Sequence, residues 1–324
     1  MRKYLVLVLL TVFLAGCGIE QPPETVPTEE TRLTEQTEVT MAIQEEAIAL
    51  AEEVPPPTGV VLEPEAPGER EERSDGAVVD YSHAEDGYIM VQHFGETDKR
   101  LKVLLYGPTT TYNYDLPQGE WAVLPLSDGD GTYRAGIYRN IRGSEYAMVM
   151  MAEFQATLED EFAPFLRPNQ YVNYQNAPNA VAMGAQLCDG MEGALEKVAV
   201  VYDFVVQNIR YDYDKASTIQ SGYLPDLDEI LEVRKGICFD YAAMMTAMLR
   251  SQQVPCKLVV GYVGDIYHAW ISIWSEEDGW IDGAIFFDGH SWKRMDPTFV
   301  SSAEDREKIL EFVENGNYKV KYLY

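Results

Sequence analysis

The sequence predicts an α+β protein in which an antiparallel β-sandwich precedes a domain of helices followed by strands. β-Branched and aromatic runs between Gly and Pro turns fill residues 76–165, and helical stripes followed by apolar runs fill residues 166–324. The length of 324 residues allows two domains, each with its own core. The hydrophobic fraction of 46% suits a globular chain.

Residues 76–165 carry the β signal. The separators include Gly107-Pro108 and Pro117-Gln118-Gly119, which are turn sequences. Six or seven strands at this spacing predict a small immunoglobulin-like sandwich. Tyrosines within the runs either form a binding face or pack between strands, and packing is the commoner role. The expected strands are 87–93, 101–106, 109–114, 132–138 and 146–151.

Residues 166–324 begin with helical periodicity. Leu195, Val198, Tyr202 and Val205 form one apolar stripe, and a second helix is expected from Cys238 to just before Pro255. Apolar runs then predict antiparallel strands, a closing helix and a Lys-guarded edge strand. Their expected ranges are 257–263, 268–274 and 291–295 for the first strands, 304–314 for the helix and 318–324 for the edge strand.

The first residues predict a targeting segment. Arg2 and Lys3 precede an apolar run over residues 5–14, which is too short to span a bilayer. The run ends in Leu14-Ala15-Gly16-Cys17, which resembles the lipobox of bacterial lipoproteins. That resemblance implies a signal peptide over residues 1–17, lipidation of Cys17 and a membrane-anchored, extracytoplasmic protein. The alternative is an ordinary cleaved signal with a chance cysteine.

Residues 18–75 predict an acidic, disordered tether. They hold fifteen Glu and one Asp against three Arg, with Pro-rich stretches such as Pro55-Pro56-Pro57. Such a composition buries too little apolar surface to offset the entropy of ordering. The whole chain has a formal net charge of −28 and no basic stripe, which excludes nucleic acid as a partner.

Three residues of the last third have the chemistry of a thiol triad. Cys238 opens a predicted helix, where unpaired backbone N–H groups favour the nucleophilic thiolate and can stabilise an oxyanion. His268 opens a predicted strand and suits a general base, and Asp296 ends one and suits an orienting carboxylate. Each also has a structural interpretation: a buried cysteine, a strand histidine and an Asp-Pro turn.

The other two cysteines of the domains, Cys188 and Cys256, admit two interpretations. They form a disulfide and leave Cys238 free, or both are small buried hydrophobic residues. The second is favoured because Cys256 opens an apolar strand.

The joint pattern over residues 176–300 resembles the transglutaminase-like core of the papain-like thiol enzymes. The matching segments are the helix ending in Asn208-Ile-Arg-Tyr-Asp212, Gly-x-Cys238 with its helix, Leu-Arg250 before a Pro-led strand, His268-Ala-Trp, and Trp292-x-x-x-Asp296-Pro-Thr. The resemblance implies Cys238 as nucleophile, His268 as base and acid, and Asp296 as orienter. Tyr211 also matches a family position and is interpreted as packing. A longer hairpin over 281–290, with Asp288 and His290, departs from the simplest members and leaves substrate shape open.

The sequence therefore predicts an enzyme that cleaves protein or peptide amide bonds through a thioester on Cys238, with no metal or organic cofactor. Water as acceptor gives hydrolysis, which we favour, and a lysine amine gives a crosslink. The competing class is a non-catalytic surface lipoprotein whose sandwich binds a partner.

Overall fold

Strands form the first part of the fold in the computed structural model, which describes residues 58–282, 285–287, 292–294 and 318–324. Two four-stranded antiparallel sheets have the orders β1-β2-β3-β6 and β5-β4-β7-β8. The strands are β1 (Glu71–Arg73), β2 (Ala77–Asp80), β3 (Tyr88–His93), β4 (Leu101–Tyr106), β5 (Thr111–Leu116), β6 (Trp121–Pro125), β7 (Gly131–Arg142) and β8 (Glu145–Ala156).

Alternation along these strands explains how the two sheets share a core. In β4 and β5 every second residue is buried, as the two-residue period of a strand requires. Tyr112 and Tyr114 are buried in β5 and belong to the same hydrophobic cluster as Val91 of β3 and Ile137 of β7. These two tyrosines thus serve packing, which is the favoured interpretation.

The second part of the fold contains both helices and strands. From Pro56 onward the chain forms one contact unit, so the two parts belong together. The helices are α2 (Pro178–Leu187), α3 (Ala194–Asn208), α4 (Tyr213–Thr218), α5 (Leu227–Val233) and α6 (Cys238–Ser251), with short 3-10 turns at Ala163–Phe165 and Tyr174–Asn176. The strands are β9 (Arg210–Tyr211), β10 (Lys235–Gly236), β11 (Cys256–Val263), β12 (Ile266–Ser275), β13 (Gly279–Asp282), β14 (Ile285–Phe287), β15 (Trp292–Arg294) and β16 (Tyr318–Leu323).

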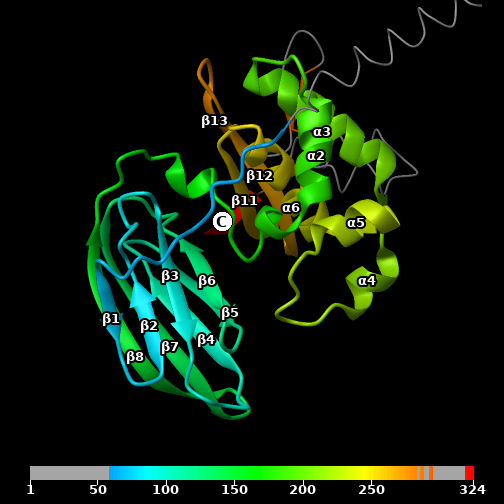
Figure 1. The fold of residues 1–324 in the computed structure, drawn as a ribbon. Helices are drawn as coiled ribbons and strands as arrows, with labels where there is room; N and C mark the ends of the chain where they lie inside the picture. The colour runs from blue at the N-terminus through cyan, green and yellow to red at the C-terminus, as the bar shows by residue number, and fades with distance from the viewer. Residues whose placement is uncertain (1–57, 283–284, 288–291, 295–317) are drawn as a thin grey trace, which may run out of the picture. The chain divides into compact units, whose positions relative to one another are not determined.

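Helix α6 is the centre of this second part. It packs against strands β11 and β12 on one side and against α2 and α3 on the other (Figure 1). Every residue from Asp240 to Ser251 is buried, so the helix has no solvent face over that length. The sheet beside it has the order β13-β12-β11-β16, in which the last strand forms an edge, as its lysines predicted.

A buried guanidinium fixes the C-terminal end of α6. Arg250 is fully buried and donates to three backbone carbonyls: Cys256 at 2.9 Å, Arg167 at 2.6 Å and Tyr324 at 2.6 Å. Burial lowers the pKa of Arg250 to about 10, so the side chain stays charged at neutral pH. This one side chain ties the helix to the start of β11, to the segment before α2 and to the residue after β16.

The structure has seven strands within residues 76–165, β2 to β8, which agrees with the six or seven expected there. It corrects the positions of some, because β2 and β6 lie in segments for which no strand was expected, and β1 precedes that region. The predicted tether to residue 75 is too long, because Glu71–Arg73 pairs with β2 and Val60 donates to the carbonyl of Ser251 at 2.7 Å. The tether was predicted from charge and proline content, and composition does not show which backbone groups form hydrogen bonds.

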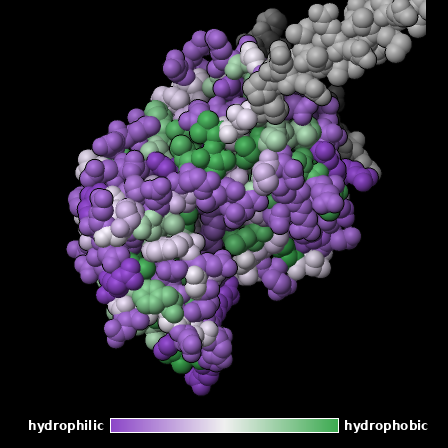
Figure 2. Space-filling model, viewed as in Figure 1, coloured by the Kyte–Doolittle hydropathy of each residue, from purple (hydrophilic) through white to green (hydrophobic). Residues whose placement is uncertain are grey.

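Several expectations lie outside the described residues: the leader with Cys17, most of the tether and the closing helix at 304–314. In the described part of the chain no helix is long and apolar enough to cross a membrane. Figure 2 shows that hydrophilic residues cover most of the face in view, in keeping with the acidic composition.

Candidate active site

Cys238 is the first residue of α6, as the sequence predicted. The residue before it, Ile237, is extended at φ −102° and ψ 177°, and the first intrahelical bond runs from the N–H of Tyr241 to the carbonyl of Ile237. The first N–H groups of a helix have no acceptor within the helix. The half-buried thiol of Cys238 therefore lies beside backbone donors at the positive end of a fourteen-residue helix.

A buried carboxylate holds this helix start in place. Asp240 is fully buried and accepts from the backbone N–H of Ile237 at 2.8 Å, from the Tyr223 hydroxyl at 2.6 Å and from Lys215 Nζ at 2.6 Å. Ile237 has no side-chain acceptor, so this is one half of a capping box. Burial and the neighbouring Asp240 raise the pKa of Tyr223, which keeps its hydroxyl protonated as a donor.

Gly236 is needed for space rather than for an unusual backbone conformation. It does not lie in the left-handed region, and a Cβ atom there would approach the Cβ of Asp240 to 2.8 Å. Its missing side chain leaves room for the side chain of Asp240. Gly236 also pairs with Tyr211 through the parallel strands β10 and β9.

His268 lies in β12, directly opposite Gly261 of β11. The imidazole is 5% exposed and stacks beside Trp270 with ring centroids 6.4 Å apart. Gly261 cannot carry a side chain, because a Cβ atom there would lie 2.1 Å from the carbonyl oxygen of Lys319. The glycine thus lets β16 approach β11 where the pairing shifts register, beside the histidine.

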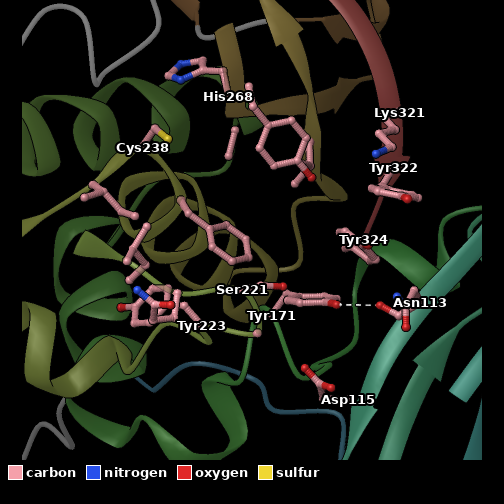
Figure 3. A pocket seen from close by; sticks show the side chains of 18 of the residues that line it. Asn113, Asp115, Tyr171, Ser221, Tyr223, Cys238, His268, Lys321, Tyr322 and Tyr324 are labelled. Atoms are coloured by element: carbon pink, nitrogen blue, oxygen red, sulfur yellow. Dashed lines mark hydrogen bonds between the residues drawn. The ribbon is translucent and has the colours of Figure 1, made fainter. Parts of the chain in front are cut away.

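Cys238 and His268 line one cavity of about 560 Å³ (Figure 3). They approach it from α6 and β12, which pack together, so the fold brings two members of the predicted trio to one place. The aromatic rings of Phe239, Tyr267 and Tyr322 also line this space. Burial raises the pKa of Tyr267, with smaller contributions from neighbours that include Cys238.

The N-terminal sheets supply one wall of the same cavity. Lys102 of β4 and Arg100, which precedes that strand, line it together with Asn113 and Asp115 of β5. Tyr171 bridges the two parts, since its hydroxyl donates to the carbonyl of Asn113 at 3.1 Å, the contact drawn in Figure 3.

The loop after α4 forms a further wall and touches the N-terminal sheets at its tip. Gly222 has φ +92°, and a Cβ atom there would lie 2.7 Å from Asp115 Oδ2 and 2.8 Å from Arg100 Nη2. Sequence reasoning missed this wall because residues far apart in the chain build it.

The third member of the trio, Asp296, lies outside the described residues, as do Asp288 and His290 of the long hairpin. Tyr211, interpreted from the sequence as packing, does pack on the core and also lines the cavity. The residues that sequence reasoning missed are Lys215, Tyr223 and Asp240. Of these, only Asp240 carried a usable signal, as an acidic residue in the first turn of a helix.

The remaining thiols differ from Cys238 in their surroundings. Cys188 and Cys256 are buried and free, so the structure agrees with small buried residues rather than a disulfide. Burial raises the pKa of Cys256 to about 11 and also raises the pKa of Cys188. Cys238 is thus the most accessible cysteine in the part of the chain that the structure describes.

Comparison with known proteins places this site in a family. Residues 182–283, which hold Cys238 and His268, match the model of the transglutaminase-like superfamily, and this segment of the chain belongs to that superfamily. A protein-glutamine gamma-glutamyltransferase of Pseudomonas aeruginosa is 29% identical over 98 residues, 26% of this chain and 13% of that protein. A UPF0252 protein of Methanocaldococcus jannaschii is 29% identical over 84 residues, 24% of each. The match thus spans under a quarter of either relative.

Solved structures with similarity to this chain include a candidate cysteine protease from Cytophaga hutchinsonii. That protein is 13% identical, has a TM-score of 0.34 and aligns over 73% of this chain and 83% of its own. Red sea bream transglutaminase is also 13% identical, with a TM-score of 0.28 over 72% of this chain and 56% of its own.

Proposed function

We propose that this chain is a transglutaminase-like thiol enzyme that acts on amide bonds of proteins or peptides. The observation that carries the proposal is the shared cavity of Cys238, at the start of α6, and the buried imidazole of His268 on β12. Acyl transfer needs a nucleophile and a general base, and here a thiol beside helix N–H donors and an imidazole line one cavity.

In the proposed reaction, the Cys238 thiolate attacks the carbonyl carbon of an amide, and the C–S bond forms as the carbonyl π electrons move to oxygen. The N–H groups at the start of α6 stabilise that oxyanion. Collapse of the intermediate breaks the C–N bond, and the His268 imidazolium gives its proton to the departing amine. A thioester on Cys238 remains. Asp296 accepts the second imidazole N–H and keeps the ring oriented.

The second half of the reaction consumes the thioester. Water gives up a proton to His268 as its oxygen attacks the acyl carbon, the C–S bond breaks, and the thiolate returns. We propose hydrolysis as the main outcome, because the cavity opens to solvent and transfer to an amine requires a site that excludes water. Crosslinking of glutamine to an amine is the alternative, favoured by the similarity to a protein-glutamine gamma-glutamyltransferase.

The N-terminal sequence supports a proposal for the cellular location of the enzyme. We propose that Cys17 is lipidated, that the acidic segment after it spaces the domains from a membrane, and that the enzyme acts outside the cytoplasm. The sheets β1 to β8 are proposed as an immunoglobulin-like sandwich, supported by two antiparallel sheets that share one core.

The first test is labelling with a thiol-directed electrophile across pH. Wild type is expected to react at Cys238 near neutral pH faster than a free cysteine does, and Cys238→Ala to lose that label. His268→Ala and Asp296→Ala are expected to retain the label at a reduced rate. A Cys238 rate equal to that of a free cysteine in wild type would overturn the activated thiol.

The second test separates water from amine as acceptor. The protein is incubated with a glutamine peptide, with and without a labelled primary amine, and products are followed by mass spectrometry. Hydrolysis predicts a mass gain of about one unit from amide to acid, at a rate that the amine does not change. Amine incorporation as the main product would establish transamidation instead.

A further inference from the structure

The charge of the cavity is opposite to that of the chain. The chain has 53 acidic residues against 25 Lys and Arg. Among the described residues, the charged side chains that line the cavity beside His268 are three cations and one carboxylate: Arg100, Lys102, Lys321 and Asp115. A net charge of −28 on the chain disfavours acidic ligands in general. The positive charge of the cavity lining therefore favours a negatively charged ligand.

The carboxylate is already paired with one of the three cations. Arg100 donates to Asp115 through two bonds, from Nε at 2.9 Å and from Nη2 at 2.8 Å. Such a bidentate contact joins the edge of the guanidinium to both oxygens of the carboxylate. Gly222 packs against this pair, which confines it further. Arg100 and Asp115 thus form a neutral wall, and the excess positive charge comes from the two lysines.

Lys102 enters the cavity from the N-terminal sheets. It is half-buried and lies opposite Asp115 in the register of β4 and β5, but Asp115 pairs with Arg100. The contact that the structure gives Lys102 is with the ring of Tyr146, 5.6 Å from Nζ to the centroid. No carboxylate in the described segments lies within ion-pair distance of this ammonium group.

Lys321 enters from the other side, on β16. Its ammonium group lies 5.0 Å from the ring centroid of Tyr322 and 5.7 Å from that of Tyr267, two aromatic residues of the cavity wall. Within the described ranges it also has no carboxylate partner. Figure 3 shows Lys321 and Asn113 on the side of the pocket away from Cys238. The position is suited to a group on the substrate that is separated from the reacting amide.

We propose that the cavity selects peptides with a carboxylate separated from the cleaved amide bond, held by Lys102 and Lys321. The inference rests on the proposed function for the peptide nature of the substrate, since the anionic group of a peptide is a carboxylate. Two ammonium groups beside aromatic rings can take a side-chain carboxylate while the rings cover the adjacent chain. The N-terminal sheets then act as a specificity wall of the active site.

The test is a pair of fluorescent peptides that are identical except for Glu against Gln at one position, scanned along the sequence. Binding is measured on the full chain with Cys238→Ala, so that the result does not depend on turnover. At the best position the Glu peptide is expected to bind about tenfold tighter at low salt, with the advantage falling as ionic strength rises.

Three substitutions assign that preference. Lys102→Gln and Lys321→Gln are each expected to reduce the Glu advantage about threefold and to leave binding of the Gln peptide unchanged. Lys319→Gln is the matched control, because it removes the same charge from the same strand at a residue outside the cavity wall. It is expected to keep the preference. If a lysine variant fails to fold, the salt dependence of the wild-type preference remains as a measurement.

Equal binding of the two peptides at every position would overturn the inference, as would a preference that survives loss of both lysines. The proposed function is judged separately by the labelling of Cys238 in wild type. A reactive Cys238 with no Glu preference refutes only the specificity. An unreactive Cys238 with a Glu preference refutes only the catalysis.

Discussion

The two ends of helix α6 each contain a buried charge, and they differ in how that charge is satisfied. At the N-terminal end, Asp240 meets an ammonium group, a hydroxyl and a backbone N–H. At the C-terminal end, Arg250 meets three backbone carbonyls. The first end opens onto a cavity through Cys238, and the second is closed on all sides.

This difference in partners suggests that Arg250 mainly stabilises the fold, whereas Asp240 mainly positions Cys238 for its reaction. Backbone carbonyls belong to segments that are distant in sequence, so Arg250 joins parts of the fold. Side-chain partners belong to one neighbourhood, so Asp240 orients a local helix start on which Cys238 depends. We therefore expect substitutions at the C-terminal end to cost mainly stability. At the N-terminal end they should affect Cys238 more than they affect stability.

The largest expected effect comes from Arg250→Met. The substitution keeps a long apolar stem but leaves three buried carbonyls without their donor, and a loss of about 4 kcal/mol in unfolding free energy is expected. Urea denaturation measures it. The alkylation rate of Cys238 in the remaining folded protein should stay near that of wild type.

Arg70→Met is the control for Arg250. Arg70 pairs with Glu85 at 3.0 Å on the surface, with about half of each side chain exposed. Its loss is expected to change stability by under about 0.5 kcal/mol. Similar costs for the two variants would show that the carbonyl contacts of Arg250 do not hold the fold together.

Asp240→Asn tests the other end at nearly constant shape. The amide cannot balance Lys215, so a stability loss of about 2 kcal/mol is expected, together with slower alkylation of Cys238. Urea denaturation and the pH profile of the alkylation rate measure the two effects.

Lys215→Met completes a double-mutant cycle with Asp240→Asn. Because the two groups are in direct contact at 2.6 Å, the double variant should lose less than the sum of the single variants by about 1 kcal/mol or more. Strict additivity would refute the coupling. A stability loss with an unchanged Cys238 rate would refute the role of Asp240 as a positioning residue.

The comparison also shows which features of the site can be predicted from the sequence. Periodicity places α6 and β12, because a helix start before Cys238 and a strand through His268 are local properties of the chain. The network around Asp240 and the cation wall with Lys102 and Lys321 were not predicted. The Asp240 network joins side chains of α4, of the loop after it and of α6, and local periodicity does not show how these segments fold onto one another. Lys102 and Lys321 come from elements that are remote in sequence, and the pairing of β16 with β11 and the contact of Tyr171 with Asn113 bring those parts together.

Gly236→Ala is expected to have a moderate effect. The added methyl group would press on Asp240 at 2.8 Å, so the carboxylate must shift, at a cost of about 1–2 kcal/mol and with a slower Cys238 reaction. Thermal unfolding and alkylation kinetics measure both.

Gly193→Ala serves as the comparison for Gly236. A methyl group there meets only the Glu196 side chain, at 3.4 Å. The variant should therefore resemble wild type in Tm and in the rate at Cys238. A Gly236→Ala protein equal to Gly193→Ala in both properties would contradict the close approach of Asp240.

The smallest expected effect is on the two structural thiols. The pKa of Cys256 is raised to about 11, so this thiol stays protonated while pH rises through 8 and 9, and burial raises the pKa of Cys188 as well. Iodoacetamide labelling with peptide mapping should therefore find Cys238 modified and these two unmodified over that range. In urea all three should react, because the unfolded thiols ionise near their ordinary pKa. Since folding keeps a proton on Cys256 that the unfolded chain releases, stability should fall as pH rises from about 9 to 11. Equal labelling of Cys256 and Cys238 in the native protein would contradict this prediction. It would mean that the reagent reaches the buried thiol of Cys256 as easily as it reaches Cys238 in the cavity.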